Sequence, residues 1–189
     1  MVEQHPLPAG SAWAAVILCL GATAGLLVQR RIHQHRAHVG QRVHFADGTS
    51  SWVYRETVVE QPPPVAPAVL VMAFRLRGVR GCGHVLFRPV SLLSTPLFVG
   101  FPGFVSKLWL AHDEQGVYRG IYQWDGPIRA ADYARALWRV LALVSVPGSI
   151  RYHVLPGVQR DEVLDQPGPA GRSLDGAWWR PAQARTAVS

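Results

Sequence analysis

The sequence predicts an α+β domain whose elements follow in the order β-α-β-β-α-β. Three runs rich in aromatic and apolar residues, at 101–110, 116–127 and 149–157, have the composition of strands. The second and third runs enclose one amphipathic helix, and an apolar strand at 68–76 with a further helix precedes the first. This order gives a small sheet with its helices on one face, so what covers the other face decides the function.

The helix between the second and third runs is the best defined element. Asp125 can cap its start, and Pro127 suits the first helical turn. Apolar side chains then recur at helical spacing until Pro147 and Gly148 end the helix: Ala134, Leu137, Trp138, Leu141 and Val144. This stripe predicts core packing, so Trp138 is assigned to the core rather than to a ligand site.

Near the N-terminus, residues 12–28 are apolar and carry no charge, and with their flanks they approach the ~20 helical residues that cross a bilayer. Trp13 lies where an interfacial aromatic would lie, and three arginines follow the other end: Arg30, Arg31 and Arg36. Because positive residues mark the cytoplasmic side, we expect a single-pass anchor in the cell membrane with the main domain in the cytoplasm. The alternatives are a buried helix and a cleaved signal peptide, although the latter would carry its basic residues before the apolar run.

Turn and proline signals divide the rest of the chain. The sequence A-D-G-T at 46–49, between two strand-like runs, predicts a β-hairpin, and the prolines of 61–67 predict a semi-rigid linker. Near the end, Trp178 and Trp179 could pack on the domain or touch a membrane interface. The expected segments are a short N-terminal segment (1–10), the anchor (11–29), a basic juxtamembrane segment with the hairpin (30–60), the linker (61–67), the α+β domain (68–157) and a flexible tail (158–189).

The formal net charge of +7 comes almost entirely from arginine, because Lys107 is the only lysine. No arginine run interleaves with aromatic residues at the spacing of a nucleic-acid motif, so we expect no nucleic-acid partner. Cys19 and Cys82 are expected to be free thiols in a reducing compartment. His33, His35 and His38 form a cluster within the basic segment. We expect this cluster to be a solvated face of the protein and expect no metal site there.

The segments P-G-F-V-S-K-L-W-L at 102–110 and G-V-Y-R-G-I-Y-Q-W at 116–124, in this order of elements, resemble the dimeric α/β-barrel proteins of the antibiotic-biosynthesis-monooxygenase type, and especially their small monooxygenase branch. The resemblance covers roughly 68–157. It implies a ferredoxin-like fold, a homodimer whose sheets pair face to face, and a pocket in each subunit. It also implies a range of activities, which includes cofactor-independent monooxygenases, haem-degrading oxygenases, isomerases and cyclases. The asparagine that several of the oxygenases use has no counterpart, because this chain contains no asparagine.

Strand alternation predicts which side chains share a face. If His112 lies opposite Val117 in the hairpin, the aromatic face contains Val105, Lys107, Trp109, Ala111, Tyr118, Gly120, Tyr122 and Trp124. This face has the composition of a small-molecule site. The other face contains the aliphatic residues Leu108, Leu110, Val117 and Ile121 and is expected to pack against the helices. Arg119 and Gln123 interrupt this aliphatic pattern.

Lys107 is the leading catalytic candidate, because an ammonium on the aromatic face can stabilise an enolate or phenolate. His153 or Tyr122 would remove the proton. The alternatives are that Lys107 reaches the rim or pairs with Asp125, and that His153 is a structural histidine. The candidate substrate-binding residues are Trp109, Tyr118, Trp124, Arg75 and His84.

The apolar stretch 92–104 is expected to be core or dimer interface, or else a gate for a lipophilic substrate. We therefore expect a membrane-anchored enzyme that acts on a polyketide-like, polycyclic or quinol-like molecule, by cofactor-independent monooxygenation or by cyclisation or isomerisation. The alternative is a non-catalytic protein that binds a hydrophobic ligand or haem.

Overall fold

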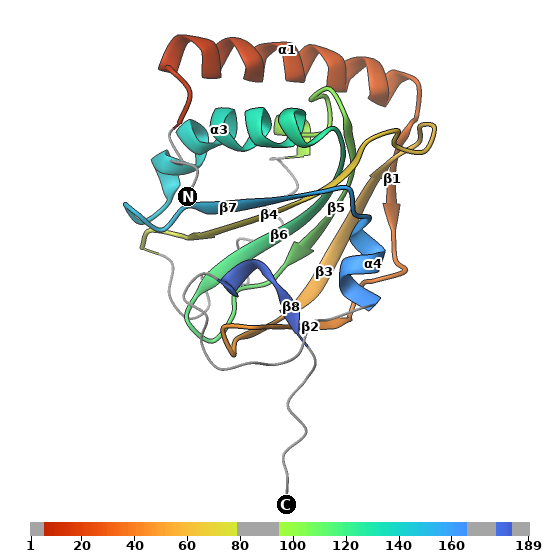
Figure 1. Ribbon diagram of the computed structural model, residues 1–189. Coiled ribbons are helices and arrows are strands. Elements are labelled where there is room, and N and C mark those ends of the chain that lie inside the picture. Colours follow the sequence, from red (N-terminus) through yellow and green to blue (C-terminus); the bar gives the residue numbers. More distant parts are fainter. Residues whose placement is uncertain (1–5, 79–94, 166–176, 183–189) are drawn as a thin grey trace, which may run out of the picture.

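The computed structural model describes residues 6–78, 95–165 and 177–182 (Figure 1). The first helix expected in the α+β domain falls at 79–94, outside the described residues, and so does Cys82. The described elements are α1 (Ala9–Val28), β1 (Ile32–His35), β2 (Arg42–Phe45), β3 (Ser50–Val59), β4 (Pro67–Arg75), the 3₁₀ turn η1 (Thr95–Leu97), β5 (Phe104–Leu110), β6 (Val117–Asp125), α3 (Pro127–Val144), β7 (Arg151–Pro156), α4 (Arg160–Asp165), the 3₁₀ turn η2 (Ala177–Trp179) and β8 (Pro181–Ala182).

Four strands form the antiparallel sheet expected for the α+β domain. Their spatial order is β7-β4-β6-β5, so the outer strands β7 and β5 flank the central pair β4 and β6. In chain order this is 4-1-3-2, the ferredoxin-like arrangement of a β-α-β-β-α-β unit. The central strand β4 is buried on both faces, which explains its continuous apolar sequence P-A-V-L-V-M-A-F-R. The predicted fold class is therefore confirmed.

The N-terminal strands extend this sheet beyond β5. The hairpin expected around 46–49 is present as β2 and β3, and the long strand β3 pairs antiparallel with β5. Strand β1 pairs with β3, and β2 pairs with the C-terminal β8. The sheet curls as it continues, so that β2 and β8 lie across from β4 and β7 in Figure 1.

The long helix α3 covers the aromatic face of the sheet. Register places Lys107 opposite Tyr122 and Trp109 opposite Gly120, as the alternation predicts. A bulge between Phe104 and Ser106 puts Phe104 opposite Trp124, so Phe104 and not the predicted Val105 shares this face. However, the expectation that the helices would pack on the aliphatic face is wrong for α3, because Tyr133 and Leu137 share one cluster with the aromatic side chains. Large aromatic residues fill the space between a helix and a sheet as well as aliphatic residues do, so composition alone did not separate the two faces.

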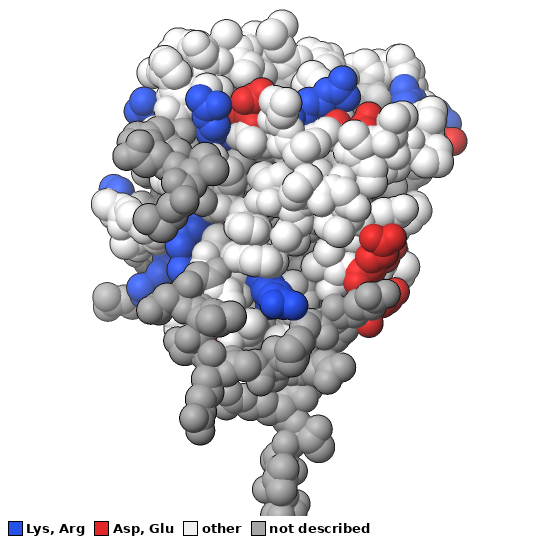
Figure 2. Space-filling view, viewed as in Figure 1, with Lys and Arg blue, Asp and Glu red and all other residues white. Residues whose placement is uncertain are grey.

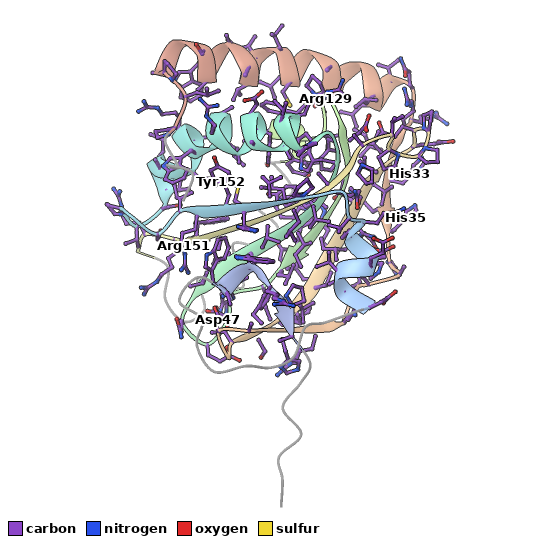
Figure 3. The ribbon with its side chains drawn as sticks, viewed as in Figure 1. His33, His35, Asp47, Arg129, Arg151 and Tyr152 are labelled. Atoms are coloured by element: carbon purple, nitrogen blue, oxygen red, sulfur yellow. The ribbon has the colours of Figure 1, made fainter. Side chains whose placement is uncertain are left out.

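The opposite face is covered by the chain's own terminal segments. Leu108 and Ile121 pack with Val43 and Phe45 of β2 and with Trp178 of η2. The short α4 also contacts this face. Along β7, Tyr152 lies on the α3 side and Arg151 on the other, where its guanidinium is 4.8 Å from the ring of Trp178 (Figure 3). Residues 158–189, expected to be a flexible tail, thus include α4, η2 and β8, and Trp178 and Trp179 pack on the domain.

Two buried arginines join these covering segments to the sheet. Arg119 on β6 pairs with Asp113 at 2.5 Å and with Asp47 at 2.7 Å, and its Nε donates to the carbonyl of Trp178. A second arginine, Arg160 of α4, pairs with the buried Glu56 at 2.9 Å and donates to Ser106. Arg119 and Gln123 interrupt the aliphatic pattern of β6 because they hold segments that lie far away in the sequence.

Helix α1 lies along α3 on the outside of the domain (Figure 1). Its buried side chains form one stripe at helical spacing: Ala12, Val16, Cys19 and Thr23. Gly100 allows the close approach, because a Cβ there would lie 2.1 Å from the carbonyl oxygen of Cys19. The helix is long and apolar enough to cross a membrane, with a mean hydropathy of 2.0, and most of its surface is exposed.

Candidate functional site

A cavity of about 270 Å³ lies between α3 and the aromatic face of the sheet. Its volume is near the lower end of the range for small-molecule sites, roughly 300 Å³. The sheet provides an aromatic floor and α3 an aliphatic roof: Trp109, Tyr118 and Tyr122 below, and Leu137, Val140 and Leu141 above. Such a lining selects a small apolar ligand and leaves few polar groups to orient it.

Lys107 lies in the middle of β5 with its Nζ against three aromatic rings. The nitrogen is 3.2, 4.5 and 4.7 Å from the ring centroids of Trp109, Phe98 and Tyr122. The residue is only 6% exposed, and no carboxylate of the described residues forms an ion pair with it. Burial therefore lowers the pKa of Lys107 well below its usual range, and the positive charge of Arg55 lowers it further.

Neither structural alternative for Lys107 is realised. The side chain does not reach the rim, because it is buried. Asp125, the expected partner, instead lies 3.5 Å from Arg129 and accepts a hydrogen bond from the backbone N–H of Ala66 at 2.8 Å. An amine on a cavity wall without a counter-ion is available to a ligand.

Tyr122 and Tyr133 form a hydroxyl pair beside Lys107. The hydroxyl of Tyr133 donates to that of Tyr122 at 3.4 Å. Gly120 lies beneath the ring of Tyr122, because a Cβ at Gly120 would lie 2.8 Å from its Cε2. Burial raises the pKa of both phenols, so that both are neutral donors at neutral pH.

Trp109 is held from the neighbouring strand. Its indole N–H donates to the hydroxyl of Thr57 at 3.2 Å, and the guanidinium carbon of Arg55 lies 4.9 Å from its ring centroid. Arg55 in turn donates to the hydroxyl of Thr95 at 2.6 Å. Strand β3 therefore orients the ring that covers Lys107.

The structure brings four of the predicted site residues together and leaves the others apart. Lys107, Tyr122, Trp109 and Tyr118 line the cavity. Trp124 is fully buried next to Tyr133, with a centroid distance of 4.9 Å, and belongs to the core beside the cavity.

The remaining three candidates lie elsewhere. His153 is on the opposite face of the sheet, where its ring stacks on Trp179 at 4.0 Å and burial lowers its pKa. Arg75 is exposed at the end of β4 and does not line the cavity. His84 lies outside the described residues.

Sequence reasoning missed four aromatic residues of the cavity wall: Tyr54, Phe74, Phe98 and Tyr133. The signal for Tyr133 was available, since it precedes Leu137 by one helical turn in the stripe that was assigned to core packing. Phe98 lies in the apolar stretch 92–104, whose described part belongs mainly to the core. Trp138 contacts Tyr152 and does not line the cavity, as predicted.

Haem fits this cavity poorly. Among the described residues of the lining there is no histidine, cysteine or methionine to serve as an axial ligand. The remaining choices are the amine of Lys107 and a tyrosinate, but the cavity of about 270 Å³ is small for a macrocycle, and burial raises the pKa of Tyr122 and Tyr133. No chemistry is therefore assigned to haem.

Comparison with known proteins yields no matching family model and no matching curated protein. One solved structure with a similar arrangement is an uncharacterised ferredoxin-fold protein related to antibiotic biosynthesis monooxygenases, from Listeria monocytogenes, with 14% identity and a TM-score of 0.40. It aligns with 58% of this chain and 64% of its own. Another is described as an anthrone oxidase-like protein, with 16% identity, a TM-score of 0.36, and coverage of 59% and 55%. Both alignments span less than two thirds of the neighbour, and at these identities the likeness concerns the fold.

Proposed function

We propose that this protein binds a hydrophobic molecule with an acidic proton, such as a phenol or an enolisable ketone, and that Lys107 removes that proton. The observation that carries the proposal is the position of Nζ, enclosed by three aromatic rings on the cavity wall and without a carboxylate partner among the described residues. The matching substrate classes are small polycyclic, polyketide-like or quinol-like molecules.

A desolvated amine suits both stages of such a proton transfer. Because its pKa is lowered, Lys107 loses its own proton more readily than a solvated lysine and can then accept one from the ligand. The resulting ammonium is attracted to the faces of the surrounding rings and to the enolate or phenolate that forms. One side chain thus acts first as the base and then as the counter-cation.

The two tyrosines support the developing charge. Tyr122 accepts a hydrogen bond from the hydroxyl of Tyr133, so its own O–H can donate a hydrogen bond to a ligand oxygen. Because both phenols stay neutral, they donate hydrogen bonds without adding a competing negative charge. His153, a candidate base from the sequence, has no part in this proposal because it lies on the other face of the sheet.

The carbanion can then follow either of two routes. Reprotonation or attack at another position of the ligand gives an isomerisation or cyclisation. Reaction with dioxygen as co-substrate converts a methylene group into a ketone and releases water, so that one oxygen atom of the dioxygen enters the product and the other leaves as water.

Non-catalytic binding is the second candidate function. It is favoured by the small number of polar groups around the cavity, since an apolar enclosure alone supplies affinity.

We also propose that α1 keeps the domain at the cytoplasmic surface of the cell membrane, where a hydrophobic substrate would be concentrated. The apolar length of the helix supports this location. The homodimer implied by the resemblance remains a proposal as well, and native mass spectrometry of protein extracted in mild detergent would report the oligomeric state together with any retained ligand.

Turnover of a panel of polycyclic phenols and ketones, with oxygen uptake recorded in parallel, tests the function. Lys107→Met should lose activity by about 10²–10⁴-fold while it retains ligand binding. His153→Ala is the matched control, because it removes a titratable group that does not line the cavity, and it should keep wild-type activity. Turnover by Lys107→Met at the wild-type rate would exclude the catalytic role, and wild-type protein that binds but converts nothing would favour the binding function. A Soret band in the purified protein would instead indicate haem.

A further inference from the structure

The outer surface of α1 is an exposed apolar face. Ile17, Leu18 and Val28 are 66%, 74% and 84% exposed. Three glycines of this helix have nothing within 4 Å of an added Cβ: Gly10, Gly21 and Gly25. Figure 2 shows the ridge above α3, where α1 lies, as uncharged. An exposed apolar helix face of this size is typical of a surface that contacts a membrane or another protein.

The inner surface of α1 packs against the domain. Cys19 and Thr23 both donate to the carbonyl of Pro96 at 3.2 Å, and Gly100 lies against the backbone of this helical turn. At the start of the helix, Leu7 donates to the carbonyl of Arg135 and accepts a hydrogen bond from Arg139. The helix is therefore held along α3 at both its first and its middle turns.

A row of charged residues lies along α3, beside and parallel to α1. Arg129 lies between the two helices in Figure 3, and Arg135 and Arg139 continue along α3. Arg30 follows the C-terminal end of α1. Figure 2 shows basic groups interspersed with acidic groups along the lower border of the uncharged ridge, and Arg129 and Arg135 lie 3.5 Å from Asp125 and Asp132. If α1 crossed a bilayer while packed on α3, these arginines would lie at the depth of the hydrocarbon, which is strongly unfavourable.

We propose that α1 lies in the plane of the membrane, with its outer face in the hydrocarbon of one leaflet and the arginines of α3 at the level of anionic phosphates. An apolar helix face bordered by arginines is the pattern of an interfacial helix. This inference rests on the proposed membrane location and replaces a span with an arrangement that keeps every contact between α1 and the domain. It depends on no property of the cavity.

The depth in the membrane of labels attached along α1 distinguishes a helix that lies in the plane of the membrane from one that spans it. In a full-length chain with Cys19→Ala and Cys82→Ala, an environment-sensitive fluorophore is attached to Ala14→Cys, Gly21→Cys or Val28→Cys. These positions share the outer face, and the first and last are about 21 Å apart along the helix axis. Quenching by lipids brominated at known depths should place all three labels equally deep in vesicles of phosphatidylcholine and phosphatidylglycerol. A label at Thr23→Cys, on the buried stripe, should be protected from the quencher.

Co-sedimentation with the same vesicles tests the hydrophobic and electrostatic contributions to membrane binding. Leu18→Glu should weaken binding by roughly 10- to 100-fold, equivalent to the burial of one leucine. The matched control Val39→Glu, beyond the far end of β1, should bind as the wild type does. Arg30→Gln combined with Arg129→Gln should weaken binding by roughly 25-fold and reduce the preference for anionic lipid.

Two results would overturn the inference. Labels that report a gradient, with Gly21 deep and the outer two positions near opposite surfaces, would establish a membrane span. A chain that ignores vesicles and forms dimers through α1 would show that a second copy covers this face. Binding of a phenol, measured in the same preparations, keeps a failure here distinct from a failure of the proposed function at Lys107.

Discussion

Replacement of Lys107 by methionine should stabilise the fold while it removes the proposed activity. Lys107 is 6% exposed, and its ammonium has no carboxylate partner among the described residues. Moving an amine from water into an aromatic enclosure costs roughly 1–3 kcal/mol, and methionine fills the same space with favourable contacts to the rings. Lys107→Met should therefore be more stable than the wild type by roughly this amount even at a pH where the amine is neutral.

The pH dependence of this stability difference identifies the buried amine as its cause. The folded-state pKa of Lys107 is lowered from 10.5, so below that pH the unfolded chain binds a proton that the folded chain does not. Wild-type stability should rise with pH toward 10.5, by up to about 1.4 kcal/mol per pH unit, and be lost as the pH falls toward the lowered pKa. The advantage of Lys107→Met over the wild type should shrink as the pH rises. The tyrosines titrate in both proteins, so the difference between the two isolates Lys107.

Urea unfolding followed by circular dichroism between pH 6.5 and about pH 9.5 measures this difference. Thr57→Val is the control, because Thr57 lies opposite Lys107 on β3 and its replacement removes no titratable group. Its effect on stability should be independent of pH. A constant gap between wild type and Lys107→Met across the range would show that the amine is solvated or paired in the folded protein.

Three further substitutions test the packing that forms the cavity and its supports. Gly120→Ala should destabilise the fold by roughly 1–3 kcal/mol and weaken ligand binding, because the ring of Tyr122 must move; unchanged melting and affinity would show that the ring does not need this space. Asp113→Asn should cost about 3–5 kcal/mol in urea unfolding, because it leaves the buried Arg119 with one partner fewer, whereas a loss below 1 kcal/mol would mean that the pair is hydrated. Gly100→Ala should loosen α1 without changing the sheet, seen as faster hydrogen exchange confined to that helix; uniform protection would argue against the close contact.

The sheet was predictable from local signals. Strand alternation and the turn at 112–117 fixed which side chains share a face, and the structure has Lys107 opposite Tyr122 as that alternation requires. The position of α3 could not be read in the same way. An aromatic face can form either a core or a ligand site, and in this fold it forms both.

The partners of the other face lie far away in the sequence. Arg119 contacts Asp47 and the backbone of Trp178, which are 72 and 59 residues away, so no local pattern announces these contacts. Tyr133 was missed for a different reason. Its helical spacing matched the core stripe of α3, and spacing alone does not say that a cavity interrupts that stripe.

The absorption spectrum of a bound naphthol tests the central claim most directly, because the neutral and ionised forms absorb at different wavelengths. At pH 7 the wild-type protein should bind the probe as the naphtholate, with its proton transferred to Lys107. Lys107→Met should bind the same probe as the neutral naphthol. A neutral naphthol spectrum in the wild-type complex would contradict the proposal that Lys107 acts as a base.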